Sequence, residues 1–157
     1  MRKLTTYSGE RTPHDLRVTI VASRFNPSIV DALIEGAART LMRLGVRSRH
    51  IELVRVPGAF EIPAAVKKVI AARQPDAVIA LGAVLRGETP HFEYICASCS
   101  QGLAQVALES SAPVAFGVLT VDTVEQAVAR SGEDDANKGS EAAASAIEMV
   151  SLFRLLG

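Results

Sequence analysis

The sequence predicts an α/β protein in which helices cover both faces of a four-stranded parallel sheet, a three-layer α/β/α sandwich. Two observations lead to this prediction. Short runs rich in β-branched residues alternate with longer segments whose apolar residues recur with the 3.6-residue period of a helix. The short runs are also apolar almost throughout, as expected for strands covered on both faces. We expect one domain over residues 1–157, in which residues 1–15 form an extended N-terminal segment.

Four segments are predicted to be strands, namely Arg17–Ala22, His50–Val56, Asp76–Leu81 and Val114–Thr120. A fifth, weak strand is suggested near Leu4–Tyr7. Right-handed crossover connections between parallel strands give the sheet order 2-1-3-4, which is the flavodoxin-like arrangement.

Five helices are expected between and after these strands. The apolar stripes run from Val30 to Leu44, from Ile62 to Ile70, from Phe92 to Val106 and from Ala143 to Phe153. Gly45 is placed to end the first helix. Thr123-Val124-Glu125-Gln126 has the pattern of a capping box and predicts a short helix before the last one.

The predicted strand order also predicts where a ligand binds. The chain changes direction between the first and third strands, so a crevice is expected beyond their carboxyl ends. Two segments leave those ends, Ser23–Pro27 and Gly82–His91. A binding site is therefore expected at this edge of the sheet on topology alone.

The segment Arg86-Gly87-Glu88-Thr89-Pro90-His91 has the features of an anion-binding helix start. Thr89 is a good N-cap and Pro90 is favoured at the first helical position. His91 then lies in the first turn, where the helix dipole disfavours the imidazolium and should lower the pKa of the ring. A neutral imidazole beside a bound phosphate could act as a proton-transferring base. The alternative is that His91 simply contacts solvent at a helix start.

Other candidates each have a structural alternative. Phe60 and Glu61 follow the second strand, where they could contact a ring; equally, Phe60 could be a core residue and Glu61 a first-turn carboxylate that favours the helix dipole. Phe25 offers an aromatic face after the first strand, whereas Asn26 before Pro27 could only cap a helix. Arg130 lies near a helix end, a common place for a surface cation.

Composition excludes several classes of function. The chain has 17 basic and 17 acidic residues and few aromatic residues, so nucleic acid is not expected as a partner. No apolar stretch approaches the ~20 residues that span a bilayer, and no signal-peptide core follows the start, so we expect a cytoplasmic protein with no membrane partner. The mean hydropathy of +0.23 is high for a small monomer and suggests that copies of the chain bury part of its surface.

The only two cysteines form Cys96-Ala97-Ser98-Cys99 inside the third predicted helix. A redox pair is normally at a helix N-terminus, and zinc needs further ligands, so we expect small core residues and no metal site. A thiol oxidoreductase is the alternative that this motif leaves open.

Taken together, several segments resemble the lumazine synthase family, whose fold is also flavodoxin-like. They occur in the family's order and spacing from about Arg17 onward, and are Arg24-Phe25-Asn26, Val56-Pro57-Gly58-Ala59-Phe60-Glu61-Ile62-Pro63, Arg86-Gly87-Glu88-Thr89-Pro90-His91-Phe92, Gly117-Val118-Leu119-Thr120 and Asn137-Lys138-Gly139. The resemblance implies a transferase of riboflavin biosynthesis that needs no cofactor. It would condense 5-amino-6-(D-ribitylamino)uracil with 3,4-dihydroxy-2-butanone 4-phosphate to 6,7-dimethyl-8-ribityllumazine, phosphate and water.

The resemblance also implies roles for particular residues. His91 would be the catalytic acid and base. The pyrimidine and ribityl chain would contact Phe25, Ala59, Phe60, Glu61, Ala83, Val84, Leu85 and Phe116. The phosphate would be bound by Glu88, Thr89, Arg130 and Lys138. Phe116, Arg130 and Lys138 match positions that the family contributes from a neighbouring subunit.

At the level of assembly, the resemblance implies a homopentamer with shared active sites, sixty-subunit icosahedral capsids built from such pentamers, and association with riboflavin synthase. Two features depart from the family pattern: Glu88 is a carboxylate near the expected phosphate, and residues 131–136 are unusually acidic. Archaeal-type riboflavin synthase and a non-catalytic flavin- or lumazine-binding protein remain alternatives with the same fold.

Overall fold

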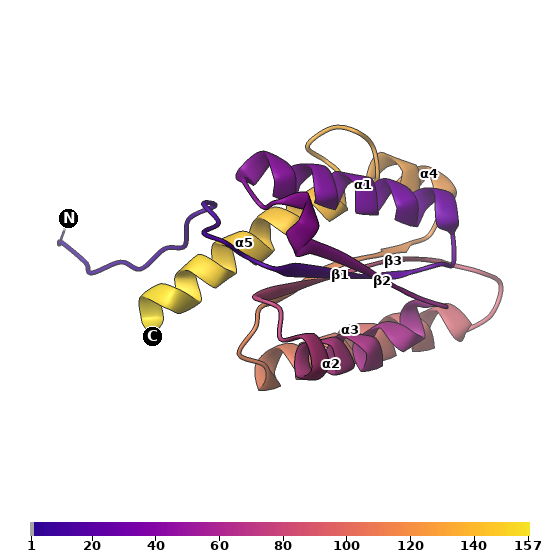
Figure 1. Ribbon diagram of the computed structural model, residues 1–157. Helices are drawn as coiled ribbons and strands as arrows, with labels where there is room; N and C mark the ends of the chain where they lie inside the picture. The colour runs from indigo at the N-terminus through magenta and orange to yellow at the C-terminus, as the bar shows by residue number, and fades with distance from the viewer. Residues whose placement is uncertain (1) are drawn as a thin grey trace.

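Four parallel strands form the sheet of the computed structural model, which describes residues 2–157 (Figure 1). The strands are β1 (Val18–Ser23), β2 (Ile51–Val56), β3 (Ala77–Leu85) and β4 (Val114–Val121). Their order in the sheet is β2-β1-β3-β4, and all three pairings are parallel. The predicted order is therefore confirmed, and the direction changes between β1 and β3.

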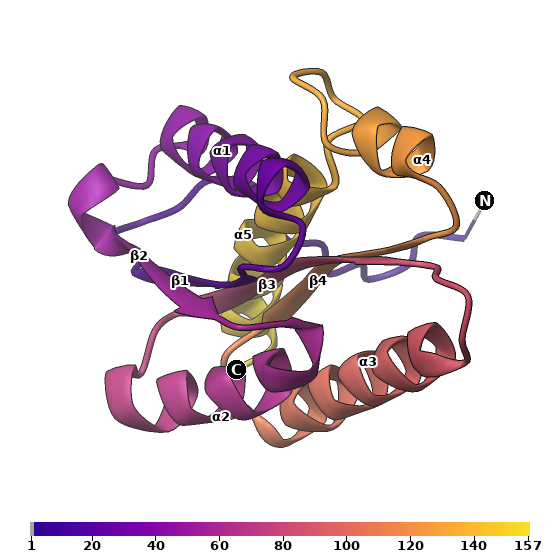
Figure 2. The same ribbon diagram turned by 90° about the vertical axis from the view of Figure 1, so that its right-hand side faces the viewer.

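Helices cover both faces of this sheet, as predicted (Figure 2). One face carries α1 (Pro27–Leu44), α4 (Val124–Ala129) and α5 (Lys138–Leu156), and the other carries α2 (Ile62–Arg73) and α3 (His91–Glu109). Two 3-10 turns, η1 (Ser48–His50) and η2 (Ala59–Glu61), flank β2. Within residues 2–157, no helix is both long enough and apolar enough to cross a membrane.

The sheet divides the core into two apolar layers. Ile20 and Ile79 face α1 and α5, whereas Val21 and Val78 face α2 and α3. All four side chains are 1% exposed or less, because neighbouring residues of a strand point to opposite faces and both faces are covered. This burial holds the carboxyl ends of the strands in fixed positions.

Strand β3 is longer than predicted. It runs to Leu85, not Leu81, because β4 continues beside it and pairs Ala83 with Leu119 and Leu85 with Val121. Residues 82–85 are therefore strand residues, and the true loop before α3 is much shorter than the predicted one. Gly82 does not end the strand, because it pairs with Val118 of β4. The position is tightly packed, since an added Cβ there would lie 2.9 Å from Ser23 Oγ.

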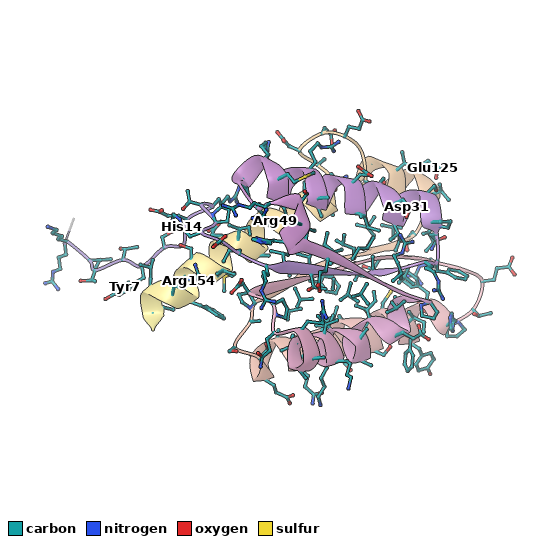
Figure 3. The ribbon with its side chains drawn as sticks, viewed as in Figure 1. Tyr7, His14, Asp31, Arg49, Glu125 and Arg154 are labelled. Atoms are coloured by element: carbon teal, nitrogen blue, oxygen red, sulfur yellow. The ribbon has the colours of Figure 1, made fainter. Side chains whose placement is uncertain are left out.

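The predicted weak strand at Leu4–Tyr7 is wrong: these residues form neither a strand nor a helix, and both named side chains are exposed. The segment extends away from the body of the domain (Figure 1), and Tyr7 lies on it (Figure 3). Residues from Gly9 onward dock on α5 instead. Glu10 N donates to Ser151 Oγ at 3.0 Å, and Arg11 Nε donates to Glu148 at 3.1 Å.

The predicted helix ends are mostly confirmed. Gly45 ends α1 in a left-handed conformation with φ of 115°, which suits glycine. Thr123 Oγ1 accepts a hydrogen bond from Gln126 N at 3.1 Å, as a capping box requires. In a capping box the side chain of Gln126 would also accept from Thr123 N. Here Gln126 Oε1 instead accepts from Asp122 N, one residue before the N-cap.

Candidate functional site

Hydrogen bonds join the three segments that leave β1, β2 and β3 at the carboxyl edge of the sheet. Arg24 N donates to Val56 O at 2.8 Å, which holds the exit of β1 against the end of β2. Asn26 Nδ2 donates to Ala83 O at 3.0 Å, which holds it against β3. Asn26 occupies the N-cap position of α1 in a left-handed conformation, but its side chain makes no capping bond. Its amide therefore links loop to strand rather than capping the helix.

Two phenylalanines stand uncovered at this edge. Phe25 is 73% exposed and Phe60 is 62% exposed. The alternative in which Phe60 is a core residue is therefore wrong. Both exposed rings are available to contact a planar ligand at this edge. Ala59, beside Phe60, is buried under the turn.

Glu61 lies in the same turn, where one carboxylate oxygen is engaged locally. Glu61 Oε2 accepts a hydrogen bond from Gly58 N at 3.0 Å. This contact bears out the predicted first-turn role, because the carboxylate satisfies an amide at the start of a turn. It also fixes the carboxylate next to Phe60.

The end of β3 presents backbone groups toward β1. The β1–β3 pairing stops at Ala22 and Leu81, while β3 continues to Leu85. Along residues 82–85 the edge that faces β1 is therefore not paired with a strand, although Ala83 O accepts from Asn26. Val84 and Leu85 are half-buried. Amides and carbonyls in this setting can bind the polar edge of a planar ring.

The start of α3 brings Thr89 and His91 together. The helix begins at His91, and Pro90 takes the position just before it. Thr89 is thus one residue further from the helix than predicted, although its hydroxyl still accepts from His91 N at 3.4 Å. The side chains of Glu88, Thr89 and His91 are all exposed.

The remaining candidates form a second group on the other flank of the sheet. Phe116 on β4 is 50% exposed, and it lines a groove of about 260 Å³ together with Lys138 of α5. Lys138 N donates to Arg130 O at 2.8 Å, so the end of α4 lies against the start of α5. Arg130 is exposed. Its Nη1 donates to Gln126 O at 3.0 Å.

The two groups lie apart in one chain. His91 begins a helix on one face of the sheet, whereas Arg130 ends a helix on the opposite face (Figure 2). Phe25 and Phe60 follow β1 and β2, while Phe116 lies on β4 at the far edge of the sheet. One chain therefore brings together the candidates at the carboxyl ends of β1, β2 and β3, and separately those around β4, α4 and α5.

Sequence reasoning missed the part that Asn137 plays beside Lys138. Asn137 is fully buried, and Oδ1 caps α5 by accepting from Ser140 N at 3.0 Å. Its Nδ2 donates to Ala32 O of α1 and to Gly132 O of the preceding loop. Asn137 thus fixes the loop whose ends carry Arg130 and Lys138. An asparagine before a helix was the available signal, but its long-range bond to α1 was not visible in the sequence.

A protein-family model matches nearly the whole chain. It is the model for 6,7-dimethyl-8-ribityllumazine synthase, and it matches residues 15–154. The chain belongs to the lumazine synthase family. It is accordingly an enzyme, a transferase with a flavodoxin-like sheet.

Two relatives carry the same family name. The 6,7-dimethyl-8-ribityllumazine synthase of Halorhodospira halophila (strain DSM 244 / SL1) is 58% identical over 142 residues, which cover 90% of this chain and 91% of that protein. The one from Aquifex aeolicus (strain VF5) is 52% identical over 150 residues, or 96% and 97% of the two chains. The likeness to lumazine synthases thus extends over the carboxyl edge of the sheet and the β4–α5 flank alike.

The cysteines fit a lumazine synthase better than a thiol oxidoreductase. Cys99 is 1% exposed, and burial raises the pKa of its thiol to about 11. Burial also raises the pKa of the half-buried Cys96. Neither is a good thiolate at neutral pH. Cys99 packs in the core as predicted, whereas Cys96 is only half-buried. Within residues 2–157 no group of three or more His, Cys, Asp and Glu side chains could hold a metal ion.

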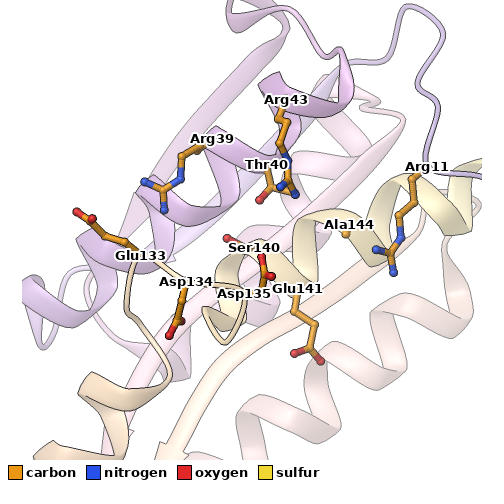
Figure 4. Close-up of a pocket in the computed structure, with 10 residues that line it drawn as sticks. All are labelled: Arg11, Arg39, Thr40, Arg43, Glu133, Asp134, Asp135, Ser140, Glu141 and Ala144. Carbon is orange, nitrogen blue, oxygen red and sulfur yellow. The ribbon is translucent and has the colours of Figure 1, made fainter.

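A second groove of this lumazine synthase family member adjoins the second group, because Glu141 lines both grooves. It has a volume of about 390 Å³, and Arg39 and Arg43 of α1 line it opposite the acidic loop Glu133–Asp135 (Figure 4). Asp134 Oδ1 accepts from Ala136 N, so part of this unusually acidic segment stabilises its own turn. None of the predicted substrate-binding residues lines this groove.

Proposed function

We propose that the chain catalyses its family's condensation in a site shared between two copies. The reaction joins 5-amino-6-(D-ribitylamino)uracil to 3,4-dihydroxy-2-butanone 4-phosphate and yields 6,7-dimethyl-8-ribityllumazine, phosphate and water. The observation that carries the proposal is the separation of the candidate residues into two exposed groups. One chain supplies the carboxyl edge of β1, β2 and β3, and a neighbouring copy supplies Phe116, Arg130 and Lys138.

On the first copy, the planar pyrimidine stacks on Phe25, which is exposed and adjacent to the end of β1. Backbone groups of Ala83, Val84 and Leu85 bind the polar edge of the ring along the unpaired side of β3. Ala59, Phe60 and Glu61 line the ribityl chain. Phe116 of the neighbour covers the heterocycle from its other side.

The phosphate ester lies between the start of α3 and the neighbour's cations. Backbone amides near Thr89 bind the phosphate from one side. The planar guanidinium of the neighbour's Arg130 binds two of the phosphate oxygens. Lys138 adds a second positive charge beside it, although in one chain its Nζ contacts Glu141 at 2.8 Å. Glu88 is exposed, so its carboxylate can turn away from the phosphate.

The chemistry follows from this placement. The amine of the pyrimidine adds to the ketone and forms an imine with release of one water molecule, and a proton then leaves the adjacent carbon as phosphate departs. His91 moves these protons, while Arg130 and the α3 start stabilise the leaving anion. Ring closure and loss of water complete the product. Alignment of two reactants by opposite surfaces lowers the barrier without a cofactor.

Exposed surface supports association of copies. Both outer strands of the sheet, β2 and β4, have one edge without a partner strand in the described chain, and such edges favour pairing or coverage. A homopentamer is the assembly we propose. A sixty-subunit capsid and association with riboflavin synthase remain predictions from the family resemblance.

Arg130→Ala tests the phosphate site most simply. Removing a guanidinium that binds a phosphate should raise the KM for the butanone phosphate about 10- to 100-fold. The KM for the pyrimidine should change little. Steady-state kinetics with lumazine fluorescence and phosphate release measure both values. Arg49→Ala, at the opposite end of the sheet, is the matched control, and an Arg130→Ala variant that behaves like it would contradict the proposal.

A further inference from the structure

One arginine outside the candidate site connects the three segments around it. Arg86 is the first residue after β3, and its backbone N donates to Val121 O at 2.9 Å, which extends the β3–β4 pairing by one residue. Only Gly87, Glu88, Thr89 and Pro90 separate this anchor from His91. The position of Arg86 therefore sets where the short loop to α3 begins.

The side chain of Arg86 reaches in two directions. Its Nε donates to Asp122 Oδ1 at 2.6 Å, at the end of β4. Its Nη1 donates to Glu93 Oε1 in the first turn of α3. Hydrogen bonds from Arg86 hold the pKa of Glu93 below its ordinary value of 4.5, so both partners are charged at neutral pH. A single side chain thus ties the start of α3 to the end of β4.

Packing adds to these ion pairs. The guanidinium lies over the ring of Phe92, with its carbon 4.4 Å from the ring centroid. Phe92 is buried, and it directly follows His91. A cation over an aromatic face is attracted by the ring quadrupole, which favours one orientation of the first helical turn.

The loop itself has few other restraints. An added Cβ at Gly87 would meet no atom within 4 Å, so the backbone there is in open space. Among the residues that the structure describes, the side chains of Glu88 and Thr89 form no hydrogen bond with another element; Thr89 Oγ1 bonds only within the loop, to His91 N. The orientation of the 87–91 loop therefore depends strongly on the contacts that hold its two ends, at the end of β3 and the start of α3.

We infer that Arg86 is a positioning residue for the reaction: through Asp122, Glu93 and Phe92 it holds the 87–91 loop so that Thr89 and His91 face the phosphate-bearing substrate. Arg86 acts through these residues and does not itself contact substrate in this account. The inference rests on the proposed site. It assigns to Arg86 the role of orienting the 87–91 loop.

The effect on stability should be small, which makes the inference testable. The side chains of Arg86, Glu93 and Asp122 are 46%, 55% and 60% exposed, and exposed ion pairs contribute little to folding. Arg86→Gln should therefore change Tm by about 4 °C or less. In contrast, misplacing a catalytic group by about 1 Å can reduce a rate 100-fold.

The experiment compares Arg86→Gln with Arg73→Gln in the complete assembled enzyme. Arg73 forms an equally exposed ion pair with Glu52 at the other end of the sheet, so it controls for the loss of a surface guanidinium. We expect Arg86→Gln to lower kcat and raise the KM for the butanone phosphate, with a combined loss in kcat/KM of about 10- to 100-fold. The KM for the pyrimidine and all constants of Arg73→Gln should stay within about twofold of the parent values.

Glu93→Gln and Asp122→Asn test the connection without removing Arg86. Each should show a smaller loss of the same kind, and Arg86→Gln combined with Glu93→Gln should lose no more than Arg86→Gln alone. Additive losses, an equal rise in both KM values, or kinetics of Arg86→Gln that match Arg73→Gln would overturn the inference. If His91→Ala and Arg130→Ala were both fully active, the proposed site itself would fail; if they are impaired and Arg86→Gln is not, only the role of Arg86 fails.

Discussion

Two aromatic side chains at the carboxyl edge of the sheet are exposed to solvent. Phe25 and Phe60 are 73% and 62% exposed. Composition and periodicity gave no reason to prefer a binding role for Phe60 over a core role. The two roles differ in whether the side chain is exposed or buried, and that depends on the tertiary structure. The binding role of Phe60 comes from the family resemblance and stays a prediction.

Other residues were predictable by type but not by contact. Asn26 and Thr89 were recognised as cap residues, yet Asn26 bonds to β3 and Thr89 lies one position earlier than expected. Arg86 was part of the motif before α3 but received no role of its own, because an arginine before a glycine carries no pattern by itself. Its contacts with Asp122 and Glu93 join residues 36 and seven positions away, and such partners depend on the fold.

At the residue scale, the two thiols give a direct test of the rejected redox function. Because the pKa of Cys99 is about 11, its thiolate fraction at pH 8 is on the order of 0.1%. Cys99 should therefore resist iodoacetamide at pH 8 in the folded enzyme, and labelling should accelerate as pH rises toward 11. Mass spectrometry of labelled protein measures this, with urea-unfolded protein as the control.

The same two residues should be dispensable for turnover. Replacing Cys96 and Cys99 by Ala together should leave kcat/KM within a few-fold of the parent value, since neither side chain takes part in the proposed chemistry. Rapid labelling of Cys99 at pH 8, or loss of turnover in the double variant at a temperature where it stays folded, would reopen the thiol hypothesis.

At the scale of elements, the sequence predicted strand order and helix positions well because burial patterns and crossover handedness depend on local sequence and general rules. The length of β3 was not predictable in the same way. Its last four residues are a strand because β4 runs beside them, and pairing across the sheet outweighs the local signal of Gly82. In the proposed site, this extended end of β3 provides the backbone edge that binds the pyrimidine.

The contact between α1 and α5 is the tightest point that positions the second group. A Cβ at Gly139 would lie 2.0 Å from Leu33 O, a backbone atom that cannot move aside easily. Gly139→Ala should therefore lower the free energy of unfolding by about 1–3 kcal/mol or more, as overpacking does. Urea unfolding followed by circular dichroism measures the change.

Gly132→Ala is the matched control for this prediction. A Cβ at Gly132 would have its nearest neighbour at 3.5 Å, an ordinary contact, so its effect on unfolding should be within about 0.5 kcal/mol. Equal stability of the two variants would show that α1 and α5 can separate without penalty. Lys138 would then lack the rigid support that the proposed site requires.

At the scale of the whole molecule, the chain has more surface than a compact monomer of its size. Its accessible area is 9210 Å², whereas a typical monomer of this mass exposes about 7600 Å². The protruding N-terminal segment accounts for part of the excess, with Leu4 and Tyr7 exposed on it. Exposed aromatic rings on both flanks add to it. These features suit a protomer that is completed by its neighbours.

The whole-molecule account makes a sharp prediction about mixed assemblies. His91→Ala alone should lose about 10- to 100-fold in kcat, as expected for loss of a general acid and base. Arg130→Ala alone should have a raised KM for the butanone phosphate. If the two residues of each site come from adjacent copies in a ring, random mixing of the two variants restores both groups at about one site in four.

The decisive measurement is therefore the activity of hetero-oligomers that contain His91→Ala and Arg130→Ala chains in equal amounts, co-expressed with different tags and isolated through both. Light scattering confirms that they have the mass of the parent assembly. We predict about one quarter of the parent activity, well above the average of the two separate variants. Activity no higher than that average would mean that His91 and Arg130 do not meet across an interface, and would contradict the shared site.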